Sequence, residues 1–290
     1  MNAHRSLRAM LFVPGNSATK LAKLATLAAH SFIVDLEDSV PPNEKERARA
    51  MVADLVRHSR DEELYVRIND VASPYATDDL AAVLDEHLAG VVVPKAESPD
   101  DLVRVNELID ALAHERGLDA TRVGVIATIE TAAGLHRVEA IAGVGGHLRR
   151  LGFGAGDFAL DLGLDWPDEE GTPEIMLWAK SQLAIASRLA GLAPPHDGAF
   201  TNYRDLEGLA REARQSRRLG FGGKHVIHPS QVAVVEDVFR PSERQIERAR
   251  RLIEAFEEAE RSGSGALGLD GELIDYAIVN RARRLLEEQD

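Results

Sequence analysis

The sequence predicts an α/β fold, a (β/α)8 barrel followed by a C-terminal helical extension. Eight short apolar runs recur between residues 8 and 228, and most are followed by a stretch of helical period. No linker interrupts this alternation, and no GxGxxG motif follows the first run. These observations favour a closed barrel over an open, doubly wound sheet. The predicted barrel domain covers residues 1–240, and the extension covers residues 241–290.

Each predicted strand is a short run of mostly small or β-branched apolar residues that stops at a turn or a polar side chain. The eight runs are residues 8–13, 32–36, 64–69, 90–95, 123–130, 151–154, 192–197 and 222–228. The seventh run is the weakest pattern because it contains Pro194 and Pro195. The fifth run, VGVIATIE, is apolar along almost its whole length, which is typical of a strand buried on both faces.

Helices are predicted between the strands from apolar periodicity and from capping residues. Asn16 or Ser17 caps a first helix, and the prolines at 41 and 42 open a second one. Two later helices cover residues 173–189 and 202–219. Beyond the eighth strand we expect a charged helix at 242–261, a flexible Ser/Gly segment at 262–265 and a last helix from about residue 272 to 288. Such a tail suits a lid or a segment that reaches a neighbouring subunit.

Composition limits the possible functions. The chain has 290 residues, 44% of them hydrophobic and 28% charged, so it can bury a large core. A net charge of −14 argues against general affinity for nucleic acid or anionic membranes. Without cysteine, disulfides and thiolate chemistry are excluded. No apolar run is long enough to span a membrane, and residues 1–8 lack a signal-peptide core, so we expect a cytoplasmic protein.

Two carboxylates stand at the ends of successive predicted strands. Glu130 closes the fifth run and Asp157 follows the sixth, with one helix and one strand between them. Because the C-terminal ends of neighbouring parallel strands lie side by side, both side chains are expected at one mouth of the barrel. Two carboxylates that converge there indicate either a hard divalent cation, Mg²⁺ or Mn²⁺, or a proton-transfer pair.

Other polar residues also follow strands and form the set of candidate site residues. The set comprises Asn16, Glu37, Asp38, Arg67, Asn69, Lys95, Glu130, Asp157, Asp197 and His228. Arg67 offers a planar fork for a substrate carboxylate, although it could instead neutralise Glu37 or Asp38 on the adjacent strand. His228, which precedes a proline, is more often a hydrogen-bonded structural histidine than a catalyst. The set predicts a pocket for a small oxyanion held on a metal.

Several short motifs resemble, in order and over nearly the whole chain, the citrate lyase β-subunit-like family (HpcH/HpaI aldolase/citrate lyase). The motifs are LFVPGN, DLEDSV, YVRIN, VPKAES, IET, FGAGDF and GFGGKHVIHPSQ. The resemblance implies a TIM barrel that carries an Mg²⁺-dependent acyl-CoA lyase. Members of that family include citryl-, malyl-, citramalyl- and hydroxymethylglutaryl-CoA lyases and some malyl-CoA thioesterases. It also implies a homo-oligomer, a trimer or a hexamer.

The resemblance also implies roles for individual residues. Glu130 and Asp157 match the family's Mg²⁺ ligands, and Arg67 matches the residue that binds the carboxylate or carbonyl end of the substrate. The family's CoA-binding positions fall on Phe12, Thr19, Lys20, Lys23, Ile227 and His228. A phosphate-rich ligand would account for lysines placed just after the first strand.

A C-terminal aspartate acts as general acid/base in the lyases that the sequence resembles, and the adjacent subunit supplies it. The matching residue here is Asp275. The surrounding segment departs from the family pattern because Leu273 replaces a methionine and Ala277 replaces a proline. These changes leave the carboxylate in place but bear on lid closure and on substrate size.

We therefore expect a lyase that cleaves a 3-hydroxyacyl-CoA into an oxo acid and an acyl-CoA, or that catalyses the reverse condensation. The alternatives are a malyl-CoA thioesterase and the β subunit of a citrate lyase complex that acts on a carrier-protein thioester. A pyruvate-class aldolase would use the same barrel and metal pair without CoA, but the lysines and Asp275 argue against it. A non-catalytic scaffold is disfavoured because Arg67, Glu130 and Asp157 are all present.

Overall fold

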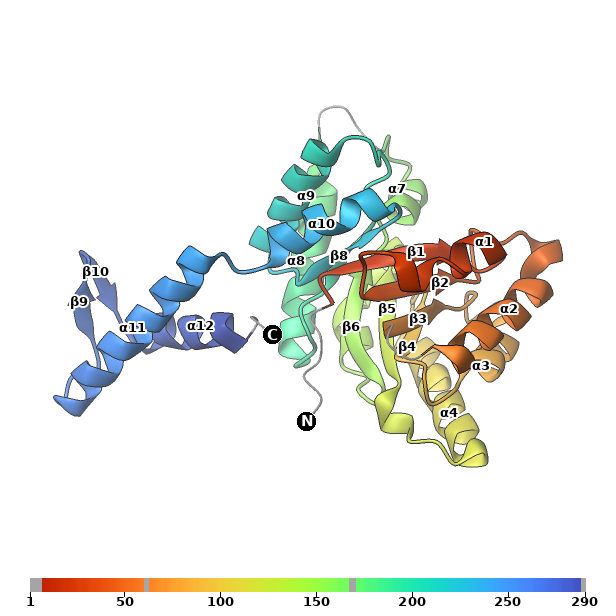
Figure 1. Ribbon diagram of the computed structural model, residues 1–290, viewed down its shortest axis with the longest axis horizontal. Coiled ribbons are helices and arrows are strands. Elements are labelled where there is room, and N and C mark those ends of the chain that lie inside the picture. Colours follow the sequence, from red (N-terminus) through yellow and green to blue (C-terminus); the bar gives the residue numbers. More distant parts are fainter. Residues whose placement is uncertain (1–6, 60–62, 167–170, 288–290) are drawn as a thin grey trace. The chain divides into compact units, whose positions relative to one another are not determined.

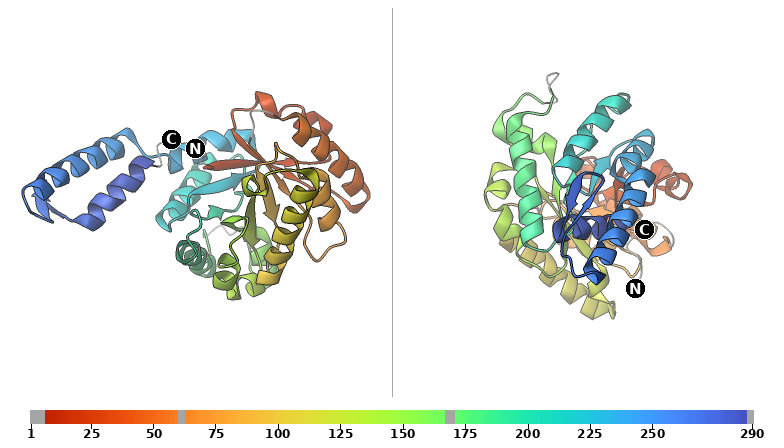
Figure 2. Two further views of the ribbon diagram at one scale, coloured as in Figure 1. Left: turned by 90° about the horizontal axis from the view of Figure 1, so that it is seen from below. Right: turned by 90° about the vertical axis from the view of Figure 1, so that its left-hand side faces the viewer.

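Eight parallel strands close into a barrel in which each strand pairs with the next along the chain and β8 pairs with β1. The computed structural model describes residues 7–59, 63–166 and 171–287. The strands are β1 (Ala9–Pro14), β2 (Ser31–Asp35), β3 (Glu63–Arg67), β4 (Gly90–Val93), β5 (Gly124–Ile129), β6 (Leu148–Phe153), β7 (His196–Asp197) and β8 (Gly223–Val226). Helices form a layer outside the strands (Figures 1 and 2). The predicted (β/α)8 barrel is confirmed.

The helices of the barrel follow their strands in sequence order. They are α1 (Ala18–Leu21), α2 (Lys45–His58), α3 (Ala76–Val83), α4 (Pro99–Arg116), α5 (Ala132–His136), α6 (Val138–Ala142), α7 (Ala155–Leu162), α8 (Glu174–Leu189), α9 (Leu206–Arg218) and α10 (Pro229–Phe239). Helix α4 illustrates how the sequence sets the two ends of a helix. Ser98 and Asp101 form a capping box at its N-terminus, and Gly117, with φ 66°, ends the helix. Among the described residues, no helix combines the length and apolarity that crossing a membrane requires.

The pattern of Leu21, Leu24, Ala25 and Ala28 predicts one helix after β1 that includes all four residues, but the helix is shorter. Helix α1 ends at Leu21, and a 3-10 turn covers only Leu24–Thr26. Leu21 and Leu24 are buried, but Ala25 and Ala28 remain exposed. Extending the helix would bury little more apolar surface, and the Ser17 side chain makes no capping hydrogen bond, so neither effect sustains a longer helix.

The seventh strand is reduced to two residues for a chemical reason. Pro194 and Pro195 have no N–H to donate, so pairing begins only at His196, which lies opposite Gly152 in β6 and Gly223 in β8. Few main-chain hydrogen bonds therefore hold β7 in the barrel.

A buried ionic cluster secures β7 to the helices outside it. The Asp197 carboxylate lies 2.9 Å from Lys180 Nζ of α8 and 2.7 Å from Lys224 Nζ of β8, and it accepts a hydrogen bond of 2.7 Å from Ser216 Oγ of α9. Burial alone would raise the pKa of Asp197, but the two ammonium groups outweigh burial and lower it. Lys224 also pairs with Glu212. Asp197 therefore serves the fold rather than the mouth of the barrel.

Two histidines, His196 and His225, are buried with their rings 5.5 Å apart. Burial lowers the pKa of His225 from 6.5 to about 3 and lowers the pKa of His196 as well. Both side chains are therefore neutral in the folded protein at neutral pH.

We expect these histidines to make the protein less stable in mild acid. The unfolded chain takes up a proton near pH 6.5 whereas the folded chain does not, so stability is lost as the pH falls from about 6.5 towards 3. For His225 the loss is about 2 kcal/mol at pH 5. Urea unfolding of the wild type and of His225→Gln at pH 7.5 and pH 5 measures it. An unchanged difference between the two proteins at the two pH values would contradict a neutral buried His225.

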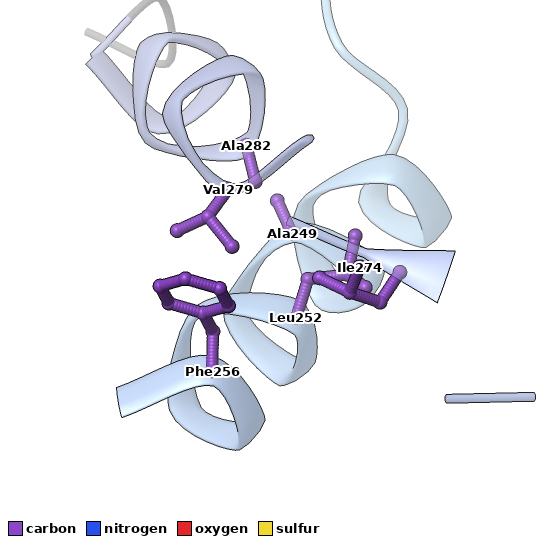
Figure 3. Close-up of a cluster of buried hydrophobic side chains, with 6 residues drawn as sticks. All are labelled: Ala249, Leu252, Phe256, Ile274, Val279 and Ala282. Carbon is purple, nitrogen blue, oxygen red and sulfur yellow. The ribbon is translucent and has the colours of Figure 1, made fainter. Parts of the chain in front are cut away.

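The second unit begins at Phe239 and has its own hydrophobic core. It contains α11 (Glu243–Arg261), β9 (Leu267–Leu269), β10 (Glu272–Ile274) and α12 (Tyr276–Glu287). Figure 3 shows its six buried side chains, which come from α11, β10 and α12. They are Ala249, Leu252, Phe256, Ile274, Val279 and Ala282.

The β-hairpin in this unit was not predicted, and the last helix begins at Tyr276 rather than near residue 272. Asp270 and Gly271 form the turn of the hairpin, with φ values of 52° and 82°. A two-residue Asp-Gly turn between alternating apolar residues is a strong hairpin signal, and Leu267, Leu269 and Ile274 supply the alternation. The sequence therefore contained the signal that the helical prediction overlooked.

Candidate active site

The polar residues at the C-terminal ends of β2, β3, β5 and β6 make up the candidate site. Asp35 and Arg67 are the last residues of β2 and β3 and lie opposite each other in the register. Glu130 directly follows β5, and Asp157 lies in the first turn of α7, after β6. Because all four strands are parallel neighbours in pairs, these side chains belong to one end of the barrel.

Glu130 is one of the buried carboxylates of the site. Its side chain is nearly buried, and Oε1 accepts a 2.7 Å hydrogen bond from the main-chain N–H of Lys95. Burial, together with the charges of Glu37 and Asp157, raises the pKa of Glu130 to about 8. A cation beside this carboxylate would lower the pKa of Glu130 and stabilise its ionised form.

The space around Glu130 depends on a glycine. A Cβ atom at Gly154 would overlap the Glu130 side chain, so a residue other than glycine fits there only if Glu130 moves. The same substitution at Gly156 would meet nothing closer than Trp166, at 3.7 Å.

We expect Gly154→Ala to displace the Glu130 carboxylate, weakening the binding of Mn²⁺ at least tenfold and lowering kcat about a hundredfold. Gly156→Ala is the matched control and should bind Mn²⁺ like the wild type. Electron paramagnetic resonance of free Mn²⁺ and steady-state kinetics provide the measurements. Equal Mn²⁺ affinity in the two alanine variants would show that the site does not need the space at Gly154.

Helix α7 is tied to the chain that follows β5. Asp161, one turn after Asp157, accepts a 2.7 Å hydrogen bond from the main-chain N–H of Ala132. Thr131 caps α5 by accepting a hydrogen bond from Gly134 N–H. These contacts fix the first turn of α7, and with it Asp157, beside the end of β5.

Arg67 is held firmly by a carboxylate that sequence analysis did not place in the site. Its Nε and Nη2 donate to the two Asp35 oxygens at 2.7 and 2.8 Å. Burial opposes the charge of both partners, yet this pairing raises the pKa of Arg67 and lowers the pKa of Asp35. The signal for Asp35 was its position at a strand end opposite Arg67.

The remaining part of the Arg67 guanidinium faces two further acids. Nη1 lies 3.1 Å from Glu37 Oε2 and 3.4 Å from Asp38 Oδ2. The guanidinium carbon of Arg67 lies 4.9 Å from the centre of the Phe12 ring. Arg67 thus does neutralise neighbouring acids, as the alternative interpretation held, and Nη1 is the part of its fork not bonded to Asp35.

Glu37 and Lys95 connect the two sides of the site. Lys95 Nζ donates to Glu37 Oε1 at 3.0 Å, and Glu37 is buried. Burial raises the pKa of Glu37 to about 7 against the lowering effect of Arg67. Burial would lower the pKa of Lys95, but Glu37 outweighs burial and raises it.

Two residues from the candidate set or its neighbourhood serve the fold instead. Lys45 is buried and donates to the main-chain oxygens of Leu36 and Glu37 at 2.8 and 2.7 Å, so it holds the loop after β2. Asn69 is buried against Asp79, with Nδ2 and Oδ2 2.6 Å apart. Both side chains are bonded to other parts of the barrel.

The positions matched to CoA lie in or after β1 and directly after β8, and these two strands are neighbours. Thr19, Lys20 and Lys23 are exposed, and Phe12 is partly buried in β1. Ile227 and His228 are exposed at the end of β8. The adjacency of the two strands places both groups at the same part of the barrel rim.

His228 has defined partners despite its exposure. Its ring stacks on Tyr203 with centres 4.9 Å apart, and Nδ1 lies 2.8 Å from Ser230 Oγ. These contacts fix the orientation of the imidazole at the rim.

Asp275 belongs to the C-terminal unit. It is exposed, and Oδ1 accepts a 3.1 Å hydrogen bond from Ile278 N–H at the start of α12. The substitutions at Leu273 and Ala277 leave this capping position intact.

Mg²⁺ is commonly held by one or two carboxylates, with water and substrate oxygens as its other ligands. No group of three or more His, Asp or Glu side chains arranged to hold a metal occurs among the residues that the structure describes. Glu130 and Asp157 would supply two carboxylates, and a cation there would stabilise the ionised form of the buried Glu130. The donor set fits Mg²⁺ and lacks the nitrogen and sulfur ligands that softer metals prefer.

In (β/α)8 barrel enzymes, catalysis takes place at the C-terminal mouth of the barrel. The closed barrel and the polar site at this mouth define the protein as an enzyme of the (β/α)8 barrel class. The model of the HpcH/HpaI aldolase/citrate lyase family matches residues 8–229. The chain belongs to this family, which confirms the resemblance found in the sequence.

Relatives in several bacteria align over nearly their full length. The citrate lyase subunit beta of Haemophilus influenzae is 34% identical, and the alignment covers 97% of this chain and 96% of the relative. The citrate lyase subunit beta-like protein of Deinococcus radiodurans is 37% identical over 100% of both chains. The L-malyl-CoA/beta-methylmalyl-CoA lyase of Cereibacter sphaeroides is 33% identical, with 99% of this chain and 95% of the relative aligned.

Solved structures show the same fold. CitE of Mycobacterium tuberculosis in complex with magnesium, acetoacetate and coenzyme A superimposes with a TM-score of 0.78 at 29% identity and covers 97% of each chain. A citrate lyase from Burkholderia xenovorans gives a TM-score of 0.84 at 24% identity, covering 96% of this chain and 90% of the other, which supports the fold alone.

Proposed function

We propose that this protein is an Mg²⁺-dependent carbon–carbon lyase that cleaves a 3-hydroxyacyl-CoA into an oxo acid and an acyl-CoA. The observation that carries the proposal is the buried Glu130 carboxylate, which lies near enough to Asp157, Glu37 and Arg67 for their charges to act on its pKa. Substrates of this class include citramalyl-, malyl-, citryl- and hydroxymethylglutaryl-CoA. The named relatives with magnesium, CoA or malyl-CoA in their descriptions support the same class.

The residues of the chain divide the work of this reaction. Glu130 and Asp157 would hold Mg²⁺, which when bound polarises substrate oxygen atoms and favours an enolate. The Nη1 edge of Arg67 would donate to the carboxylate or carbonyl end of the substrate. Phe12, Thr19, Lys20, Lys23, Ile227 and His228 would contact the CoA portion, where the exposed lysines meet its phosphates.

Proton transfer is assigned to Asp275. Its carboxylate accepts the proton of the 3-hydroxyl group while the bond between C2 and C3 breaks. The hydroxyl carbon becomes the carbonyl of the oxo acid, and the bonding electrons pass to the thioester enolate, which then takes a proton at C2. In the reverse direction the same groups catalyse a condensation.

A panel of 3-hydroxyacyl-CoA esters with Mg²⁺ tests the proposal when free thiol and oxo acid are measured separately. Oxo acid formed together with the shorter acyl-CoA supports the lyase. Thiol without oxo acid would instead identify a thioesterase. Inactivity on every free CoA ester would favour the third alternative, a subunit that acts on a carrier-protein thioester, which the similarity to citrate lyase β subunits motivates.

We further propose that the protein is a homo-oligomer, a trimer or a hexamer, in which residues 241–290 of one subunit bring Asp275 to the site of a neighbour. Mixing inactive Asp275→Asn and Glu130→Ala subunits should then restore part of the activity, because one kind of site contains both intact residues. No recovery after verified subunit exchange would place the complete site within one chain.

A further inference from the structure

Lys95 adopts a backbone conformation that is uncommon for lysine. Its φ angle is 46°, in the left-handed region, and among the described non-glycine residues only Asp270 shares this property. Asp270 forms a hairpin turn, in which positive φ is required. Lys95 instead follows β4 at the mouth of the barrel. Outliers of this kind cluster at functional sites.

The left-handed conformation gives Glu130 a main-chain partner. The N–H of Lys95 points at Glu130 Oε1 at 2.7 Å, and main-chain bonding towards β5 resumes one residue later, where Ala96 N–H donates to Thr128 at 3.1 Å. Since a Cβ atom at Gly154 would overlap Oε2, the carboxylate is held at one oxygen by Lys95 and accommodated at the other by a glycine.

The side chain of the same residue acts on the other half of the site. Its ammonium group donates to Glu37 Oε1 at 3.0 Å, and Glu37 Oε2 lies 3.1 Å from Arg67 Nη1. An ordinary ion pair between Lys95 and Glu37 would not require a left-handed backbone. The left-handed backbone is therefore explained by the main-chain contact with Glu130 and not by the side-chain contact with Glu37.

We propose that Lys95 is a positioning residue that couples the two halves of the site, its main-chain N–H orienting Glu130 and its ammonium group holding Glu37 beside Arg67. The proposal deepens the proposed function and rests on it, because it concerns the residue that would carry Mg²⁺. Partners that orient a ligating carboxylate commonly change metal affinity by 10- to 100-fold when they are lost.

The two contributions can be separated with substitutions that differ in one property. Lys95→Asn and Lys95→Ala both remove the ammonium group, but asparagine tolerates the left-handed region better than alanine. Lys95→Arg retains the cation. Thermal melting of each variant verifies folding, and Mn²⁺ serves as the probe for direct binding by electron paramagnetic resonance.

We expect Lys95→Asn to bind Mn²⁺ within threefold of the wild type, and Lys95→Ala to bind it at least tenfold more weakly. The KM for the thioester should rise about tenfold in Lys95→Asn and return to within threefold of the wild type in Lys95→Arg. Equal Mn²⁺ affinity of the alanine and asparagine variants, or a wild-type KM in Lys95→Asn, would overturn the proposal. A wild type that binds Mn²⁺ but cleaves no thioester contradicts the proposed function and leaves the Mn²⁺ comparison valid.

Discussion

Glu130→Gln is expected to reduce kcat/KM at least a thousandfold while the barrel remains folded. The amide keeps the shape of the side chain but removes one of the two charges proposed to hold Mg²⁺, and several kcal/mol of transition-state stabilisation correspond to about this factor. Because Glu37 and Asp157 oppose a negative charge at this buried position, the variant should melt at or above the wild-type temperature.

Adding Mg²⁺ separates loss of the metal site from other causes. The wild type should melt at a higher temperature with millimolar Mg²⁺ than without it, because a ligand that binds only the folded state stabilises that state. Glu130→Gln should show no such shift, and Asp157→Asn should behave in the same way. A variant that keeps both its activity and its Mg²⁺ shift would reject the assignment of that carboxylate.

Lys224→Met is expected to lower the free energy of unfolding by about 3–5 kcal/mol. Lys224 is fully buried, and its removal takes away the ammonium partner of Glu212 and leaves Lys180 as the ammonium partner of Asp197. Main-chain pairing cannot compensate, because β7 contains only His196 and Asp197.

Urea unfolding measures this loss, and Lys20→Met is the matched control because Lys20 is exposed in α1. The control should stay within about 0.5 kcal/mol of the wild type, as surface substitutions usually do. A loss below about 1 kcal/mol for Lys224→Met would mean that the cluster contributes little to the stability of the barrel.

The sequence was sufficient to predict the barrel and to place Arg67, Glu130 and Asp157 at the ends of strands. Strands appear as apolar runs, and their C-terminal ends meet in a parallel barrel, so Glu130 and Asp157 could be placed together from the chain order. The contact between Asp35 and Arg67 could not be predicted from the sequence, because it depends on which residues of β2 and β3 lie opposite each other.

The sequence also did not show which of the lysines are buried. Lys20, Lys23 and Lys45 all follow the first two strands, yet only Lys45 turns inwards and bonds main-chain oxygens. Which lysine is buried depends on how α2 packs, and composition does not report that. The left-handed φ of Lys95 was likewise invisible, since lysine is a residue type that rarely adopts it.

The C-terminal unit has a consequence for how the protein responds to heat. Its core has six buried side chains, two of them alanines (Figure 3), and the other apolar side chains packed against it are only partly buried, which is little buried apolar surface for a segment of this length. Such a segment has only marginal stability when it stands alone, so it is expected to melt before the barrel does. Warming would then displace Asp275, the proposed acid/base, and inactivate the enzyme at temperatures where circular dichroism still reports an intact barrel.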